Sequence, residues 1–109
     1  MSRYLCPYCW ERGNRRTLER DHIIPKRRTG VECNCSENLV EAHRNCNRRK
    51  KDKTPIEFFV WLQDVGHFDY WGYHHATRRK LLEELVRLEF DARRHLRESH
   101  GVQVNFVER

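Results

Sequence analysis

Two short Cys/His pairs in the first half of the chain have the spacing of zinc ligands. Cys6 and Cys9 form a CxxC, and His43 and Cys46 form an HxxC. Each pair can form a tight turn that directs two ligands at one ion, and two such turns complete the tetrahedral coordination that zinc prefers. We therefore predict a structural zinc ion bound by Cys6, Cys9, His43 and Cys46. A small, polar chain also gains stability from such a metal.

Two further cysteines leave the fourth ligand open. Cys33 and Cys35 are separated by a single residue, a spacing at which both thiols rarely ligate one zinc ion well, but either could replace His43. The pairing of His43 with Cys46 favours His43, which leaves Cys33 and Cys35 without a role. The odd number of five cysteines favours metal binding or free thiols over a disulfide framework. The remaining histidines form no ligand spacing that we recognise: His67, His74, His75, His95 and His100.

A second set of residues is interleaved with these pairs. Asp21-His22-Ile23-Ile24-Pro25 is followed by Asn38-Leu39-Val40 and then by Cys46-Asn47-Arg48-Arg49-Lys50. In this order and with these gaps, the elements resemble the His-Asn-His (HNH) endonucleases over about residues 6–60. Lys53-Thr54-Pro55 followed by Glu57-Phe58 is also similar to the segment after the active-site helix in the nuclease domains of RNA-guided DNA-cleaving effectors. The resemblance implies a ββα-metal fold with zinc knuckles, and it implies DNA endonuclease activity.

The residue types fit metal-dependent phosphodiester hydrolysis. His22 is the candidate general base, because a histidine with an ordinary pKa can be neutral and accept a proton at working pH. Asp21 and Asn47 supply hard oxygen ligands for a catalytic Mg²⁺ or Mn²⁺, which needs only one or two protein groups. Asn47 stands where the family often has histidine, and this oxygen ligand disfavours softer ions. The resemblance implies that Asn38 steadies the loop and orients the general base.

The neighbouring positions of Asp21 and His22 raise a geometric difficulty. Successive residues of an ideal strand point to opposite faces. Both side chains can approach one phosphate only if the strand is distorted or the ion lies at its edge.

Basic residues surround these positions and favour a polyanionic partner. Residues 1–54 hold 14 Lys and Arg against 7 Asp and Glu, whereas residues 55–109 hold 8 against 9. The chain has a net charge of +6, and the excess of basic residues that produces it lies entirely in the first half. We expect Lys50 to contact the DNA backbone near the scissile phosphate, with further phosphate contacts from the other basic residues of this half: Arg48, Arg49, Arg44, Arg20 and Lys26.

The 109 residues fit a single domain of α+β class, a zinc-stapled ββα-metal module with a C-terminal helical extension. We expect the nuclease core to cover residues 1–60 and the extension, packed on the core, to cover residues 61–109. No apolar run is long enough to span a membrane, and the N-terminus lacks the apolar region of a signal peptide. The expected location is therefore the cytoplasm, with no membrane partner.

The pattern predicts the elements that must position the site. Thr17–Ile24 and Leu39–Ala42 read as short strands separated by a loop over 26–38, and Arg44–Asp52 is compatible with a helix. Thr54-Pro55-Ile56-Glu57 matches a capping box and predicts a helix to about Val65. Leucines at helical spacing predict a second, amphipathic helix over about 76–98, which could cover the core or bind a second copy or a protein partner. Val102, Val104 and Phe106 alternate as in a short terminal strand.

Three functions share these features. The leading one is a metal-dependent DNA endonuclease. The second is a zinc-bound nucleic-acid-binding module that cleaves nothing, although simple binding does not require Asp21, His22 and Asn47. The third is a nuclease subunit that acts only inside a phage or defence assembly, docked through the helix over 76–98.

Overall fold

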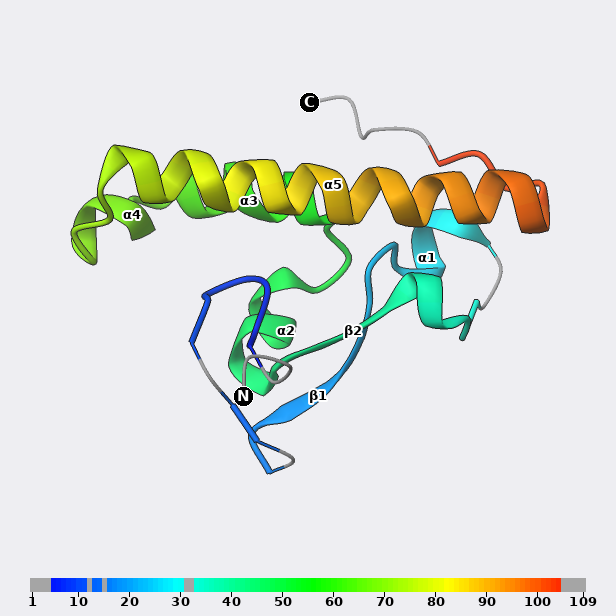
Figure 1. Cartoon of the computed structure of the whole chain (residues 1–109), viewed down its shortest axis with the longest axis horizontal. Coiled ribbons are helices and arrows are strands. Elements are labelled where there is room, and N and C mark those ends of the chain that lie inside the picture. Colours follow the sequence, from blue (N-terminus) through cyan, green and yellow to red (C-terminus); the bar gives the residue numbers. More distant parts are fainter. Residues whose placement is uncertain (1–4, 12, 15, 31–32, 105–109) are drawn as a thin grey trace.

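A computed structural model of the chain has an α+β fold in which one antiparallel strand pair is combined with helices (Figure 1). It describes residues 5–11, 13–14, 16–30 and 33–104. The elements of this part are, in chain order, β1 (Leu18–His22), α1 (Lys26–Thr29), the 3-10 turn η2 (Ser36–Asn38), β2 (Leu39–His43), α2 (Arg44–Lys50), α3 (Pro55–Asp64), α4 (His67–Tyr70) and α5 (His75–His100). The order β1, β2, α2 is the ββα unit expected from the sequence, and the predicted α+β class is confirmed.

The two strands set the framework of this unit. They pair antiparallel, with Leu18 opposite His43 and His22 opposite Leu39. Helix α2 begins directly after β2 and contacts both strands. Residues of β1 and α2 are therefore brought together even though 21 residues separate the two elements in the sequence.

The connection between the strands is more ordered than the expected loop. It contains α1 and η2. Helix α1 begins after Pro25, which is extended, and ends at Gly30, which adopts a left-handed conformation with φ 75° and donates its N–H to the Lys26 carbonyl. A glycine accepts this conformation at little cost, so a single turn of helix can be closed here.

Helix α3 follows the predicted capping box. The Thr54 hydroxyl accepts a hydrogen bond from the Glu57 amide at 3.3 Å, and the Glu57 carboxylate accepts one from the Thr54 amide at 3.1 Å. Pro55 occupies the first helical position, where its missing N–H costs nothing. These local contacts explain why the start of this helix could be predicted from sequence.

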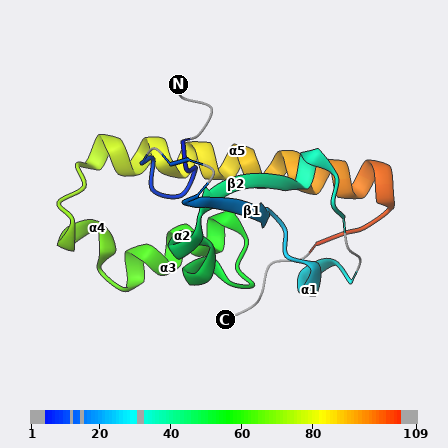
Figure 2. The same ribbon diagram turned by 90° about the horizontal axis from the view of Figure 1, so that it is seen from below.

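Helix α5 is the longest element and lies beside α3 (Figures 1 and 2). The His74 ring caps its start by accepting from the Ala76 amide, and Gly101 ends it in a left-handed conformation. Its apolar stripe is buried against the chain's own core, through Leu81, Leu85, Ala92 and Leu96. The stripe therefore covers the core, and it is not a free surface for a second copy or a protein partner.

One acidic residue interrupts this stripe. Glu89 is fully buried, and its carboxylate accepts hydrogen bonds from the Ile56 amide at 2.9 Å and from Arg93 Nε at 2.8 Å. The Ile56 amide lies in the first turn of α3, where no helical carbonyl can accept from it. Glu89 thus satisfies the start of α3 and fixes α5 against it.

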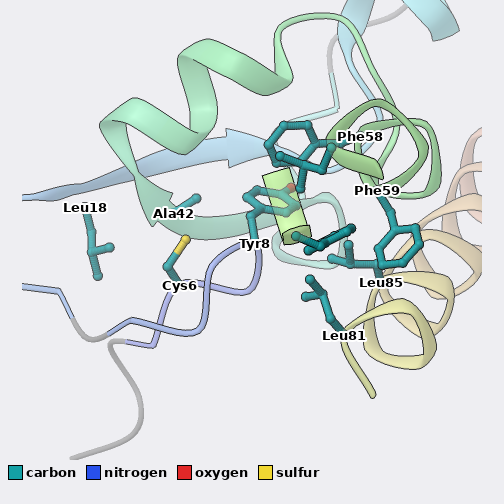
Figure 3. Close-up of a cluster of buried hydrophobic side chains, with 10 residues drawn as sticks. Cys6, Tyr8, Leu18, Ala42, Phe58, Phe59, Leu81 and Leu85 are labelled. Atoms are coloured by element: carbon teal, nitrogen blue, oxygen red, sulfur yellow. The ribbon is translucent and has the colours of Figure 1, made fainter. Parts of the chain in front are cut away.

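The main apolar cluster joins the N-terminal segment to both long helices (Figure 3). Tyr8 meets the edge of the Phe58 ring at a centroid distance of 5.5 Å, and Leu81 and Leu85 from α5 belong to the same cluster. The expected boundary between core and extension at residue 60 falls inside α3, and that division of the chain stays a prediction.

The end of the chain differs from expectation. Residues 101–104 form no strand. Val102 is instead held to the end of α5, because its amide donates to the Leu96 carbonyl, and Val104 packs in a second apolar cluster with Ala92 and Leu96. Phe106, the last residue of the predicted strand, lies outside the described residues. Within the described part, none of the helices combines the length and apolar character that crossing a membrane would require.

Candidate metal and phosphate site

The four predicted zinc ligands lie together. One ligand atom each from Cys6, Cys9, His43 and Cys46 lies within 4.8 Å of the other three. His43 Nδ1 is 3.2 Å from Cys9 Sγ, so this nitrogen faces the thiols. Three sulfur atoms and one imidazole nitrogen in such a group are a donor set typical of structural zinc sites.

The surroundings of the cluster favour the thiolate form of Cys6. Hydrogen bonds from the Cys46 and Cys9 thiols lower the pKa of Cys6, while the same contact with Cys6 raises the pKa of Cys46. The His43 amide also donates to Cys6 Sγ at 3.4 Å. Gly13 lies close to the other side of the His43 ring, where an added Cβ would come within 2.9 Å of Nε2. The backbone therefore supports one thiolate directly and packs tightly against the imidazole.

Asp21 belongs to a buried polar network between β1 and α2. Its Oδ2 accepts a hydrogen bond from the Tyr8 hydroxyl at 2.6 Å and forms an ion pair with Lys50 Nζ at 3.1 Å. Burial, together with the negative charge of Asp21, raises the pKa of Tyr8 well above its ordinary value, so the phenol remains a donor. Burial lowers the pKa of Lys50, and the charge of Asp21 opposes that change.

Lys50 is placed differently from the sequence-based expectation. Its side chain is fully buried, and Nζ also donates to the His22 carbonyl at 3.0 Å. The ammonium is therefore held inside the protein and is not exposed for a phosphate contact. Lys50 is three residues after Asn47 on α2 and lies on the face of the helix that packs on β1. The run of basic residues in the sequence does not reveal this placement.

Loss of the Lys50 charge should destabilise the fold. We expect Lys50→Met to lower the free energy of unfolding by about 3–5 kcal/mol, because removal of one partner leaves Asp21 buried without its counter-charge. Urea denaturation would measure the change. Arg48→Met, on the exposed side of the same helix, is the matched control and should change stability by less than about 0.5 kcal/mol. Equal stability of Lys50→Met and the wild type would contradict this role.

Asn47 lies near a carboxylate that the sequence argument missed. Its Nδ2 donates to Glu19 Oε1 at 2.7 Å, and Glu19 Oε2 is 3.3 Å from Arg44 Nε. Because the amide nitrogen is the donor here, the amide oxygen is the atom that a cation would bind. Glu19 and Asp21 are two residues apart on β1 and share the face that α2 covers. This spacing could have pointed to Glu19.

His22 is the last residue of β1, and its ring is half-buried. Its Nε2 is 2.8 Å from Asn34 Oδ1, in the connection between the strands. An amide oxygen can only accept, so with this orientation of the amide Nε2 carries the proton and Nδ1 is the basic nitrogen. Asn34 is the second residue that sequence analysis missed, and its distance of 12 residues from His22 left no local signal.

Asn38 is fully buried and acts on the backbone of the same connection. Its Oδ1 accepts from the Ile24 amide at 2.9 Å, and its Nδ2 donates to the Ile24 carbonyl at 3.2 Å and to the Cys33 carbonyl at 3.4 Å. These contacts join the segment after His22 to the segment that carries Asn34. An asparagine supplies both a donor and an acceptor for this purpose.

The contacts of Asp21 and His22 show the alternation of side chains that is expected along a strand. Asp21 bonds with Tyr8 and Lys50, whereas the neighbouring His22 ring bonds with Asn34. Asn47 lies on the Asp21 side, beside Glu19. Asp21 and His22 are thus neighbours on one strand, but Asp21 lies on the side of α2 and Asn47, whereas His22 faces the connection between the strands.

A basic hollow of about 810 Å³ lies beside the Cys6/Cys9/His43/Cys46 cluster. Three of the predicted phosphate-binding residues, Arg44, Arg48 and Arg49, line it, and Arg16 adds a fourth charge. Trp71 is exposed at its wall, next to Tyr73 and His67. Arg20 and Lys26 are also exposed but do not line this hollow.

A second group of possible metal ligands was not recognised from sequence. Cys33, Cys35, His95 and His100 offer one ligand atom each, all within 4.8 Å of one another. Four residues separate His95 and His100, a spacing within the range found for paired histidines in zinc sites. That spacing was the available sequence signal for a metal site, but more than 50 residues separate the two histidines from the two cysteines.

The family comparison agrees with this ββα unit. Residues 6–53 match the family model described as HNH endonuclease, so this segment of the chain is similar to that family. The match covers a little under half of the chain and includes both zinc-ligand pairs, His22, Asn38 and Asn47. Neither the curated proteins nor the solved structures give a significant match. The resemblance identified from the motifs is confirmed over this segment, and a nuclease domain of this type implies a nucleic-acid substrate.

Proposed function

We propose that the chain is a divalent-metal-dependent endonuclease that hydrolyses DNA phosphodiester bonds. The observation that carries the proposal is the contact between His22 Nε2 and Asn34 Oδ1 at 2.8 Å, within a segment that matches the HNH endonucleases. It fixes the orientation of a half-exposed imidazole and leaves Nδ1 to take a proton from water. Asn38 supports this arrangement by holding the backbone on either side of the pair.

Asp21 and Asn47 are the proposed ligands of a catalytic Mg²⁺ or Mn²⁺. Asn47 would use its amide oxygen, and Asp21 would use Oδ1, because Oδ2 is shared by Tyr8 and Lys50. Both are hard oxygen donors, which suit these ions. A bound divalent cation would neutralise charge that develops on the scissile phosphate.

The basic hollow is the proposed path of the nucleic-acid backbone. Arg44, Arg48 and Arg49 are exposed along it and can contact phosphates without reading base sequence. Arg20 and Lys26 are proposed as further contacts outside it. Structural zinc in the Cys6/Cys9/His43/Cys46 cluster would hold the end of β2 and helix α2, which bears Arg44, Arg48 and Arg49, against the N-terminal knuckle.

A plasmid assay tests the activity. We expect supercoiled DNA to be converted to nicked or linear forms when Mg²⁺ or Mn²⁺ is added, and to stay intact in a buffer that retains zinc but lacks both ions. Keeping zinc present separates loss of the catalytic cation from loss of the structural metal. If DNA binds but stays intact with every ion tested, the chain is a non-cleaving nucleic-acid-binding module, or a subunit whose nuclease acts only within a larger assembly.

A further inference from the structure

All five cysteines of the chain belong to one or other of the two Cys/His clusters. The first cluster explains Cys6, Cys9 and Cys46. Cys33 and Cys35 lie in the connection between β1 and β2, which passes close to the C-terminal end of α5 (Figure 1). Their neighbours at that end are His95 and His100. The fold thus brings two thiols and two imidazoles together from distant parts of the sequence.

Two ligand-atom distances within this second cluster are close to those of tetrahedral coordination. His100 Nε2 is 3.2 Å from Cys35 Sγ and 3.6 Å from Cys33 Sγ. Ordinary zinc–sulfur and zinc–nitrogen bond lengths place the ligand atoms of a tetrahedron about 3.3–3.8 Å apart. A small movement of the side chains is therefore sufficient to receive an ion.

His95 supplies an independent indication. Its Nε2 is buried and has no hydrogen-bond partner in the described part of the chain, and the nearest counter-charge is Glu37 Oε1 at 3.9 Å. Its Nδ1 is 3.4 Å from the Ser99 hydroxyl. A buried nitrogen without a partner is costly, whereas an imidazole that binds metal through one nitrogen usually hydrogen-bonds through the other. The His95 and His100 rings lie edge to face, with centroids 5.1 Å apart.

We propose that Cys33, Cys35, His95 and His100 form a second structural zinc site. Two thiolates and two neutral imidazoles balance the charge of Zn²⁺, and binding releases the two thiol protons to solvent. The donor set is soft enough to prefer zinc over Mg²⁺ or Mn²⁺. Cys33 is buried, while Cys35 and His100 are partly or fully exposed, so the ion has a path from solvent.

The site would join the strand connection to the long helix. Cys33 and Cys35 flank Asn34, whose side chain bonds to His22, and the second apolar cluster surrounds the same junction through Cys33, Ala92 and Leu96. Zinc bound here would hold the backbone on both sides of Asn34. Any consequence for catalysis rests on the proposed function, whereas the metal site itself does not.

Metal counting tests the proposal without reference to nuclease activity. Full-length protein saturated with zinc and then freed of excess metal should hold about two equivalents per chain, and Cys35→Ser combined with His100→Asn should hold about one. His75→Asn, an exposed histidine at the other end of α5, is the control and should retain both. A wild type with one equivalent, or a double variant with two, would overturn the site.

Two further measurements on the same proteins, cobalt absorption and cysteine alkylation, keep the test decisive if the double variant folds poorly. With Co²⁺ in place of zinc, the thiolate charge-transfer band should fall by about two fifths in the double variant, because two of five cobalt–sulfur bonds are lost. In the wild type, Cys35 should react with iodoacetamide in the metal-free protein and be protected when zinc is bound, as mapped by mass spectrometry. Equal alkylation of Cys35 with and without zinc would refute the assignment.

Discussion

Replacing His22 with alanine should lower the rate of Mg²⁺-dependent plasmid nicking by about 10²–10⁴-fold, the contribution typical of a positioned general base. The imidazole is half-buried at the end of β1 and bonds to Asn34 through Nε2, so removing it should leave the fold intact. Nicking would be followed by gel electrophoresis of supercoiled plasmid under single-turnover conditions. Far-ultraviolet circular dichroism and zinc content should match the wild type.

The matched control for this variant is His75→Ala, which removes an exposed histidine far along the sequence from the candidate site. It should cleave at the wild-type rate. If His22→Ala retains Mg²⁺-dependent cleavage close to that rate, His22 is not the base, even though the chain remains a nuclease. That outcome would separate the assignment of the base from the assignment of the activity.

Removing one ligand of the first zinc cluster should unfold the N-terminal half. We expect Cys46→Ser to lose one zinc equivalent and its cooperative unfolding transition, because a structural zinc site contributes about 10–16 kcal/mol in small zinc domains. That contribution is comparable with the whole stability of a typical domain, about 5–15 kcal/mol. The ligands of the cluster come from the knuckle around Cys6, the end of β2 and the start of α2.

Zinc content and urea denaturation followed by tryptophan fluorescence would measure this loss. Asn45→Ala is the control, since Asn45 lies in the same HxxC turn but is exposed and offers no ligand. It should keep its zinc and unfold within about 0.5 kcal/mol of the wild type. A Cys46→Ser protein that binds as much zinc and resists urea as well as the wild type would contradict the structural role.

The two clusters of possible metal ligands show what the spacing of ligands in the sequence can predict by itself. Cys6 with Cys9 and His43 with Cys46 were recognisable because each pair is local and each forms its own turn. In the second cluster, His95 and His100 had an acceptable spacing, but Cys33 and Cys35 lie on a different element. Only the packing of α5 over the strand connection brings the four together.

Lys50 is a residue whose surroundings the sequence pattern did not reveal. As one of several basic residues at the end of α2, it resembled its neighbours Arg48 and Arg49, and a phosphate contact was predicted for all three. Packing of α2 on β1 buries Lys50 against Asp21 and leaves the two arginines exposed. A charge count cannot distinguish a solvated lysine from one whose buried carboxylate partner lies 29 residues earlier in the chain.

The sequence by itself determined the features that depend on neighbours in the chain: the start of α3, the two strands, the first zinc cluster and the motif order of the HNH segment. Capping and knuckle turns are short-range contacts, so their residue types and spacing are sufficient to predict them. Tertiary structure decided the partner of His22, the burial of Lys50 and the second cluster. Each of these depends on which faces of distant elements pack together, and burial changes a side chain's charge partners and accessibility without changing the local pattern.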